Sequence, residues 1–332
     1  MDAQRAWRGM VTGIVAAGML LAGNAAVQAG QAQEVLKFRS GGVSPVTDPS
    51  SVAMERLSKL VKERTGGKVD FTHFGGGQIG GERDMVEGVQ LGTVGMVITG
   101  VTGHPIYDAF FLPYVFRDRE HMWKVLDGPI GEEWNQRMIK ERGMRVLGYM
   151  YRGPRQLTTT KRMVKTAADV KGLKIRVPEI APMLATWKAL GASPTPMAWP
   201  EVFTGLQQGS IEGQENPLEL IASSKLWEVQ KFLTLTNHVR VAWIVLLDER
   251  LWKRMTPETQ QIMTSSWREV STDMEKQILA SEQKLIDEIK SHGVTVIEPD
   301  VESFRQAVKD VWRDVAPKAW GPGVYERIQG TR

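Results

Sequence analysis

The sequence predicts an α/β fold of two lobes, with mainly parallel sheets flanked by helices and one long bracing helix. Apolar strand patterns alternate with helical patterns along most of the chain, which is typical of parallel sheets covered by helices. At 332 residues the chain suits two lobes of ordinary domain size. A helical pattern then continues over residues 257–291, roughly 50 Å at the α-helical rise, which is longer than one small domain needs.

Each predicted element rests on a local signal. Asp48 followed by Pro49 predicts a helix start, and Thr166 with Asp169 has the spacing of a capping box. Helices are predicted at residues 48–66, 81–91, 166–172, 200–209, 257–291 and 301–315, with one more that ends near residue 190. Strands are predicted at residues 35–39, 68–74, 94–99, 158–160, 173–177, 211–214, 241–247 and 294–297.

The first 29 residues have the pattern of a secretory signal peptide. Arg5 and Arg8 precede an apolar run at residues 10–21, and small residues follow it. The run is shorter than the roughly 20 residues that span a bilayer, so we expect cleavage rather than a permanent anchor. Cleavage is predicted after Ala29, with Ala32 as the second choice. The expected location is the bacterial periplasm.

Composition excludes several function classes. The chain has no cysteine, so it has no disulfide, no thiol chemistry and no lipid-anchoring cysteine. The formal net charge of +4 is small, and acidic and basic residues alternate through the helices, so we do not expect nucleic acid as a partner. No cofactor and no metal are expected, since the five histidines lie far apart and show no metal-ligand spacing.

The loop at residues 75–80 matches the glycine pattern of a dinucleotide-binding turn. Such a site also needs an acidic residue about 20 positions further on, and the strand that ends at Thr99 supplies none. A tight turn that lets backbone approach a ligand is therefore the preferred interpretation. Carboxylate pairs such as Glu82 with Asp84, or Glu212 with Glu215, could act as acid and base, but this spacing is common on solvated turns. Nothing in the sequence favours an enzyme.

Four side chains between residues 152 and 217 suggest a receptor for an organic anion. Arg176 lies at the carboxyl end of an apolar strand, where ligands of α/β sheets bind, and Arg155 lies in the turn before a threonine-rich strand. Arginine matches a carboxylate with two parallel hydrogen bonds. Trp199 offers an aromatic face, although it could instead pack against the start of a helix as a hydrophobic staple. Asn216 offers an amide, although it could merely serve a turn.

The same region carries the motifs of a known family. The runs are GLKIRVP (172–178), GASPTPM (191–197), EGQENP (212–217), EVQK (228–231), LTNH (235–238) and GGQIG (76–80). Together they closely resemble the solute-binding proteins of tripartite ATP-independent periplasmic (TRAP) transporters, DctP type. The resemblance covers essentially the whole chain after the signal peptide.

This resemblance implies a periplasmic binding protein fold, type II-like, that closes on a ligand and passes it to a membrane permease. The implied division is residues 30–152 plus 242–281 for lobe I and residues 153–241 plus 282–332 for lobe II. A monomer is expected. A role as a sensor partner is an alternative that the sequence does not separate from transport.

The resemblance also implies roles for single residues. Arg176 is the expected carboxylate clamp and Arg155 its support, while Asn216 and Trp199 fill the amide and aromatic positions. In lobe I the candidates for ligand contact are Ser44, Gln78 and the loop from Thr99 to Thr102.

The expected ligand is a sugar acid, a uronate or an aldonate. Trp199 and Trp243 suit the apolar faces of a sugar ring, and Trp187 lies near the strand end that resembles sugar-acid binders. C4-dicarboxylates and other small hydroxy or oxo acids are the alternative. A dicarboxylate would need a second cationic group in lobe I, and the candidate loops there have none. A secreted sugar-acid enzyme is the less favoured third possibility.

Overall fold

The computed structural model describes residues 35–332, so the predicted signal peptide lies outside the described residues. The strands in this part of the chain fall into two groups that share the strand β4 (Met144–Thr159). The first, called here the β1 group, contains β1 (Leu36–Gly41), β2 (Val69–Phe74), β3 (Met96–Thr99) and β9 (Arg240–Asp248). The second, called here the β5 group, contains β5 (Lys174–Val177), β6 (Ser193–Pro196), β7 (Gly213–Pro217), β8 (Phe232–Thr234) and β10 (Thr295–Ile297).

Strand pairing within the groups is mixed. β1 pairs in parallel with β2 and β3, and β5 in parallel with β6 and β7, as the βα alternation predicts. β3 pairs antiparallel with β9, and β9 with β4. The α/β fold class is confirmed, and the antiparallel pairs arise where the chain returns to each sheet through β4 and β9.

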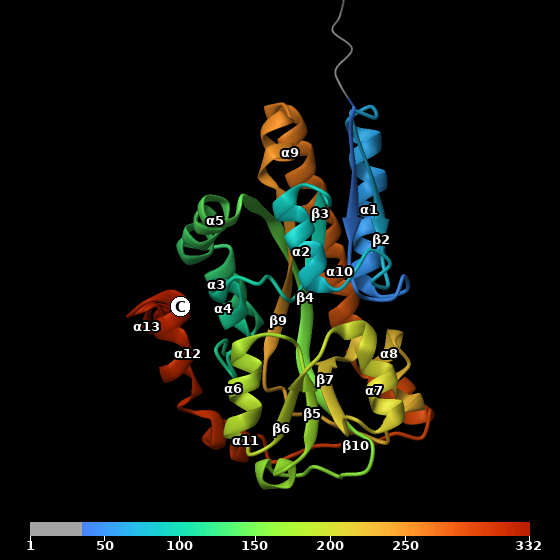
Figure 1. The fold of residues 1–332 in the computed structure, drawn as a ribbon, viewed down its shortest axis with the longest axis vertical. Helices are drawn as coiled ribbons and strands as arrows, with labels where there is room; N and C mark the ends of the chain where they lie inside the picture. Colours follow the sequence, from blue (N-terminus) through green and yellow to red (C-terminus); the bar gives the residue numbers. More distant parts are fainter. Residues whose placement is uncertain (1–34) are drawn as a thin grey trace, which may run out of the picture. The chain divides into compact units, whose positions relative to one another are not determined.

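β4 is the strand that the sequence pattern largely missed. Its first part pairs with β9, and its last part pairs with β7 and β8, so it runs through both groups (Figure 1). The pairing with β9 shifts register twice, between Val146 and Gly148 and between Tyr151 and Pro154. Only residues 158–160 were expected as strand, because the earlier part of β4 takes its pairing partners from far along the chain.

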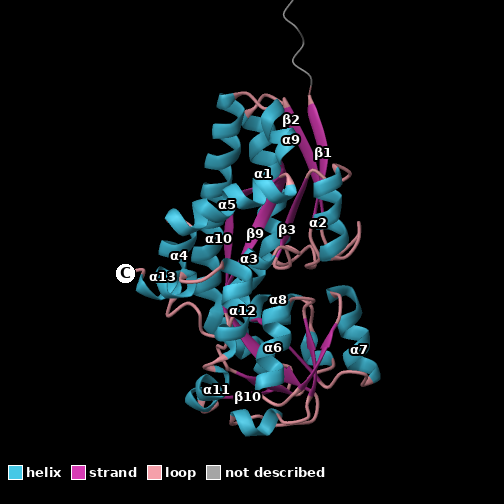
Figure 2. Cartoon of the chain, turned by 60° about the vertical axis from the view of Figure 1, so that its left-hand side comes forward, coloured by secondary structure: helices cyan, strands magenta, loops and turns pink. Residues whose placement is uncertain are grey.

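Helices cover both faces of these strands (Figure 2). The β1 group carries α1 (Pro49–Arg64), α2 (Glu82–Leu91), α3 (Pro105–Asp108), η1 (Ala109–Phe111), α4 (Arg119–Leu126), α5 (Pro129–Arg142) and α9 (Glu249–Arg254). The β5 group carries η2 (Ala167–Val170), α6 (Ala181–Ala189), η3 (Trp199–Glu201), α7 (Val202–Gln208), α8 (Leu218–Ser223) and η4 (Leu226–Glu228). Asp48 caps α1 as predicted, because its side chain accepts a hydrogen bond from the Ser50 amide.

The predicted long helix is α10 (Pro257–Ser291). It packs on α1, β4 and α8, so it spans both strand groups (Figure 1). Its buried side chains recur at helical spacing, and among them Trp267 fits directly over Gly148 of β4. No helix within residues 35–332 combines the length and the apolar character that crossing a membrane requires.

The C-terminal segment forms three helices where the sequence predicted one. These are α11 (Val301–Val308), α12 (Val311–Trp320) and α13 (Val324–Gly330). Trp320 stacks on Trp134 of α5, with ring centroids 5.5 Å apart, and donates a hydrogen bond to the Ile106 carbonyl of α3. The predicted division assigns residues 282–332 to lobe II, yet these contacts join α12 to helices assigned to lobe I. The lobe boundaries therefore stay a prediction.

Candidate ligand-binding site

A narrow cavity lies beside β4, between the two strand groups. The space free of protein atoms there is about 300 Å³, which includes open solvent at its mouth. Its lining residues are Val43, Glu82, Gly100, Val101, Phe111, Arg155, Arg176, Pro178, Trp199, Asn216, Leu220 and Trp243. The four side chains predicted between residues 152 and 217 therefore converge.

Arg176 lies near the carboxyl end of β5 and is buried. Its Nε donates to the Met197 carbonyl at 2.9 Å, and its guanidinium lies 5.4 Å from the centre of the Trp199 ring. No other hydrogen bond joins this guanidinium to residues 35–332. Burial lowers the pKa of Arg176 to about 10, so the side chain remains charged at neutral pH. A buried cation with unused donors is a strong receptor for a carboxylate.

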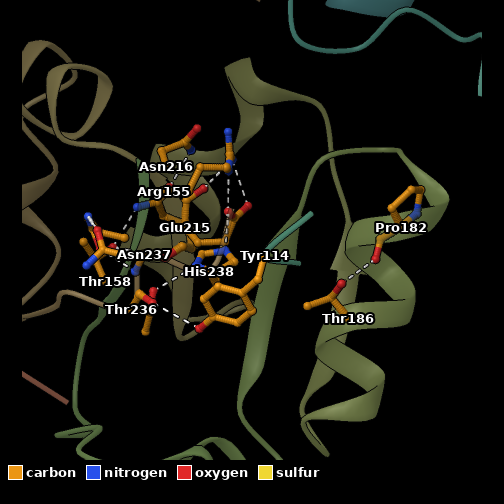
Figure 3. Close-up of polar contacts among 12 residues, drawn as sticks. Tyr114, Arg155, Thr158, Pro182, Thr186, Glu215, Asn216, Thr236, Asn237 and His238 are labelled. Carbon is orange, nitrogen blue, oxygen red and sulfur yellow. Dashed lines mark hydrogen bonds and ion pairs between the residues drawn. The ribbon is translucent and has the colours of Figure 1, made fainter. Parts of the chain in front are cut away.

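Arg155 also lines the cavity, but its charge already has a partner. Its Nε donates to Glu215 Oε2 at 2.5 Å and its Nη2 to Glu215 Oε1 at 2.8 Å, a bidentate pair (Figure 3). His238 contacts the same Oε2 at 3.0 Å through Nε2. Burial would raise the pKa of Glu215, but Arg155 and His238 outweigh it and hold the pKa below its ordinary value. The geometry thus gives Arg155 a fixed orientation within an ionised cluster.

Glu215 corrects one expectation. The sequence suggested a solvated turn for Glu212 and Glu215, whereas Glu215 is fully buried in β7. Its partners come from β4 and from the segment before β9, so no local pattern could reveal them. The only available signal was its place between Gln214 and Asn216, two other polar residues of one short strand.

Asn216 is held by a chain of amides. Its Nδ2 donates to Gln214 Oε1 at 2.6 Å, and Gln214 Nε2 donates to Thr158 Oγ1 at 2.8 Å. Within residues 35–332 no hydrogen bond uses the Asn216 amide oxygen. The side chain can therefore accept a hydrogen bond from a molecule in the cavity. The strand also continues through Pro217, which pairs with Arg155, where the sequence predicted a break.

Three aromatic rings form the apolar walls: Trp199, Trp243 and Phe111. The Trp199 ring lies beside the Arg176 guanidinium. The centre of the Phe111 ring lies 5.5 Å from Cζ of the Arg155 guanidinium. Trp187, which the sequence placed near the site, is fully buried against His238 instead and does not line the cavity.

Glu82 is a lining residue that the sequence analysis, which paired it with Asp84, expected on a solvated turn. It opens α2, and its Oε1 accepts hydrogen bonds from the Thr99 hydroxyl at 2.9 Å and the Gly100 amide at 3.1 Å. Its charge acts on Arg176 and favours the ionised guanidinium. Glu82 lies two residues after the GGQIG motif, which could have drawn attention to it. Thr99, which was predicted to contact the ligand, does not line the cavity but holds the Glu82 carboxylate through the hydrogen bond from its hydroxyl.

Of the other predicted contacts, the loop from Thr99 to Thr102 contributes Gly100 and Val101 to the cavity lining, whereas Ser44 and Gln78 lie outside it. Ser44 is fully buried, and its carbonyl accepts hydrogen bonds from the Gly76 amide and the Ser51 hydroxyl. Gln78 is exposed in the glycine turn. Gly76 and Gly77 have φ of 64° and 70°, so the turn needs their freedom, as predicted. No group of metal-binding side chains was found among residues 35–332.

Known proteins are similar to this chain in sequence and in fold. The family model of the bacterial extracellular solute-binding proteins, family 7 (DctP), matches residues 40–318. The 2,3-diketo-L-gulonate-binding periplasmic protein YiaO of Escherichia coli K12 is 35% identical over 286 residues, which cover 85% of this chain and 87% of YiaO.

Two solved structures are similar along most of both chains. A TRAP periplasmic solute-binding protein from Polaromonas sp. JS666, bound to D-erythronate, has a TM-score of 0.84 and 34% identity over 90% of this chain and 99% of its own. Another from Roseobacter denitrificans OCh 114, with bound L-galactonate, has a TM-score of 0.84 and 32% identity over the same shares. The chain therefore belongs to the DctP family, the periplasmic solute-binding proteins of TRAP transporters for small organic acids, which are binding proteins and not enzymes.

Proposed function

We propose that this protein captures a sugar acid, an aldonate or a uronate, and delivers it to a TRAP membrane permease. In this proposal the ligand carboxylate pairs with Arg176, and ligand hydroxyl groups donate to Glu82 and Asn216. Trp199 and Trp243 pack against the carbon skeleton. Arg155, whose orientation is fixed by its ion pair with Glu215, lies beside the carboxylate end of the ligand.

The observation that carries this proposal is the charge of the cavity lining. Arg155 and Arg176 are the cations that line it within the described chain, and Arg155 is already paired with Glu215. This leaves one unpaired cation, which suits one carboxylate. Glu82 contributes an acceptor that suits hydroxyl donors and repels a second carboxylate. A polyhydroxylated monocarboxylate satisfies both groups.

The names of the relatives support the same ligand class. YiaO is named for a diketo sugar acid, and the two similar structures carry a four-carbon and a six-carbon sugar acid. The lining differs from what a C4-dicarboxylate needs, because besides Arg176 and the paired Arg155 it carries Glu82 and no further cation among the described residues. The dicarboxylate remains the second candidate for the experiment.

A thermal-shift screen tests the ligand class. It compares D-erythronate, L-galactonate and D-glucuronate with succinate and L-malate, each at a saturating concentration. A ligand at 100 times its dissociation constant adds about 2.7 kcal/mol to the unfolding free energy, which gives a clear shift. We expect shifts with one or more of the sugar acids. Stabilisation by succinate or malate, with none by any sugar acid, would refute the assignment.

Export and assembly complete the proposal. We propose that residues 1–29 direct secretion, that the mature chain acts as a monomer, and that lobe closure presents the ligand to the permease. The family supports the periplasmic location and the permease partner. Mass spectrometry of protein recovered from the periplasm tests the first part, with an N-terminus at Gly30 expected and an uncleaved chain as the contrary result.

A further inference from the structure

A second buried ion pair lies behind the ligand cavity. Arg152 and Asp48 are both completely buried, and they form two parallel hydrogen bonds, from Nη1 to Oδ1 at 2.7 Å and from Nη2 to Oδ2 at 2.9 Å. Burial would raise the pKa of Asp48, but Arg152 outweighs it and the pKa lies below its ordinary value. A well-packed apolar pair often stabilises a fold as well as a buried ion pair does, so stability alone does not explain these charges.

Arg152 contacts a wall of the cavity. Its guanidinium lies over the Trp243 ring, with Cζ 4.5 Å from the ring centre, and Trp243 lines the cavity on β9. Arginine stacked on an aromatic face in a desolvated place makes a strong cation–π contact. The two hydrogen bonds to Asp48 fix the orientation of the planar guanidinium that stacks on this ring.

Asp48 connects this wall to two helices. It caps α1, where it accepts hydrogen bonds from the Ser50 amide and hydroxyl, and it also accepts one from the Ser223 hydroxyl of α8 at 3.1 Å. One turn earlier on α8, Leu220 lines the ligand cavity. The pair therefore joins the start of α1, the end of α8 and the Trp243 wall through β4.

We propose that the Asp48–Arg152 pair is a positioning device for ligand capture, which holds the Trp243 ring against the cavity and ties α1 to α8 around the bound ligand. The identity of the ligand in this inference rests on the proposed function, whereas the contact between Arg152 and Trp243 does not. It assigns both residues a role in retaining the ligand, although neither lines the cavity.

The chain offers a matched control for this pair. Arg145 and Glu249 also form a bidentate pair, with distances of 2.8 and 3.1 Å, and Arg145 Cζ lies 4.8 Å from the centre of the Trp252 ring. None of these three residues lines the cavity. The bonding pattern is the same, but the control pair is partly exposed, with 23% and 9% of the Arg145 and Glu249 side chains accessible, and it lies away from the ligand site.

The experiment compares two double variants with the wild type. Asp48→Asn/Arg152→Met removes both charges while Asn keeps the helix cap, and Arg145→Met/Glu249→Gln does the same at the control pair. Fluorine NMR of 5-fluorotryptophan protein without ligand reports on the Trp243 signal, assigned with Trp243→Phe. Stopped-flow fluorescence measures the dissociation rate of L-galactonate.

In the first double variant we expect a shifted and broadened Trp243 signal and dissociation faster by about tenfold or more. The control variant should leave both readouts as in the wild type, whatever its melting temperature. An unchanged Trp243 signal, or a dissociation rate within about twofold of the wild type, overturns the inference.

Two further arms keep the result decisive. If the wild type does not bind L-galactonate, D-erythronate or D-glucuronate, the proposed function fails, and the Trp243 signal still decides the inference. If the first double variant does not fold, Arg152→Lys replaces it, because lysine keeps the charge but loses the planar stacking. An unmoved Trp243 signal in that variant refutes the positioning role.

Discussion

At the residue scale, Arg176 carries the largest predicted effect. Replacing it by alanine leaves a ligand carboxylate buried without its partner, which costs ~3–5 kcal/mol. We expect Arg176→Ala to lower the affinity for the best sugar acid by two orders of magnitude or more, measured by isothermal titration calorimetry. The affinity of Arg176→Lys should lie between those of the wild type and Arg176→Ala, because lysine keeps the charge but cannot form the two parallel hydrogen bonds of a guanidinium. Wild-type affinity in the alanine variant would remove Arg176 from the site.

Glu82 is the residue that we expect to separate ligand classes. Glu82→Gln removes a negative charge from the cavity, so succinate should bind more tightly and L-galactonate about tenfold more weakly, because hydrogen bonds to charged groups are the stronger ones. Asp84→Asn is the control, since Asp84 lies in the same first turn of α2 but is exposed and caps the helix. If both variants change the ratio of the two affinities equally, Glu82 does not select the ligand.

At the element scale, α8 carries a titrating carboxylate. Burial raises the pKa of Glu219 to about 7, with Arg152 opposing the shift and Asp48 and Glu282 adding to it. The folded protein therefore holds this proton more tightly than the unfolded chain. The free energy of unfolding should fall by about 3 kcal/mol as the pH rises from about 4.5 through about 7.

The variant Glu219→Gln cannot ionise, so it should lose this part of the pH dependence. Urea unfolding at pH 5 and pH 8 measures the difference for each protein. Glu288→Gln, an exposed change on α10, should keep the wild-type difference. An equal pH dependence in Glu219→Gln and the wild type would contradict a raised pKa at this position.

The contact between β4 and α10 depends on a missing side chain. A Cβ atom at Gly148 would lie 2.3 Å from Trp267 Cδ1, so Gly148→Ala forces the ring or the strand to move. Overpacking of this kind costs about 1–3 kcal/mol of unfolding free energy. Gly330→Ala, where a Cβ atom has open space, is the control in chemical denaturation. Equal stability of the two variants would show that the contact adapts freely.

Elements with local signals were predictable, and those with distant partners were not. Asp48 with Pro49 marked the start of α1, and Thr256 with Pro257 that of α10, because a cap and a proline act within one turn. β4 forms its hydrogen bonds with β7, β8 and β9, which lie far along the chain. Its local sequence pattern therefore gave little indication of a strand. The same cause hid Glu215, whose two partners come from separate segments.

At the scale of the whole molecule, the family assignment followed from ordered motifs, while the ligand did not. The motifs lie mostly in the β5 group; they supply Arg176 and Asn216, and Trp199 follows one of them by two residues. The β1 group supplies Glu82, and its distance from Arg176 in the sequence gave no hint that both line one cavity. The charges that bear on ligand class thus come from both strand groups and meet only in the folded molecule.

The central claim is that one carboxylate binds Arg176 while hydroxyl groups face Glu82. A crystal structure of the protein with L-galactonate, or with whichever sugar acid stabilises it most, tests this directly. We predict two hydrogen bonds from the Arg176 guanidinium to the ligand carboxylate, about 2.7–2.9 Å long, and at least one ligand hydroxyl within hydrogen-bond distance of Glu82. A ligand carboxylate bound away from Arg176, or turned toward Glu82, would contradict the account.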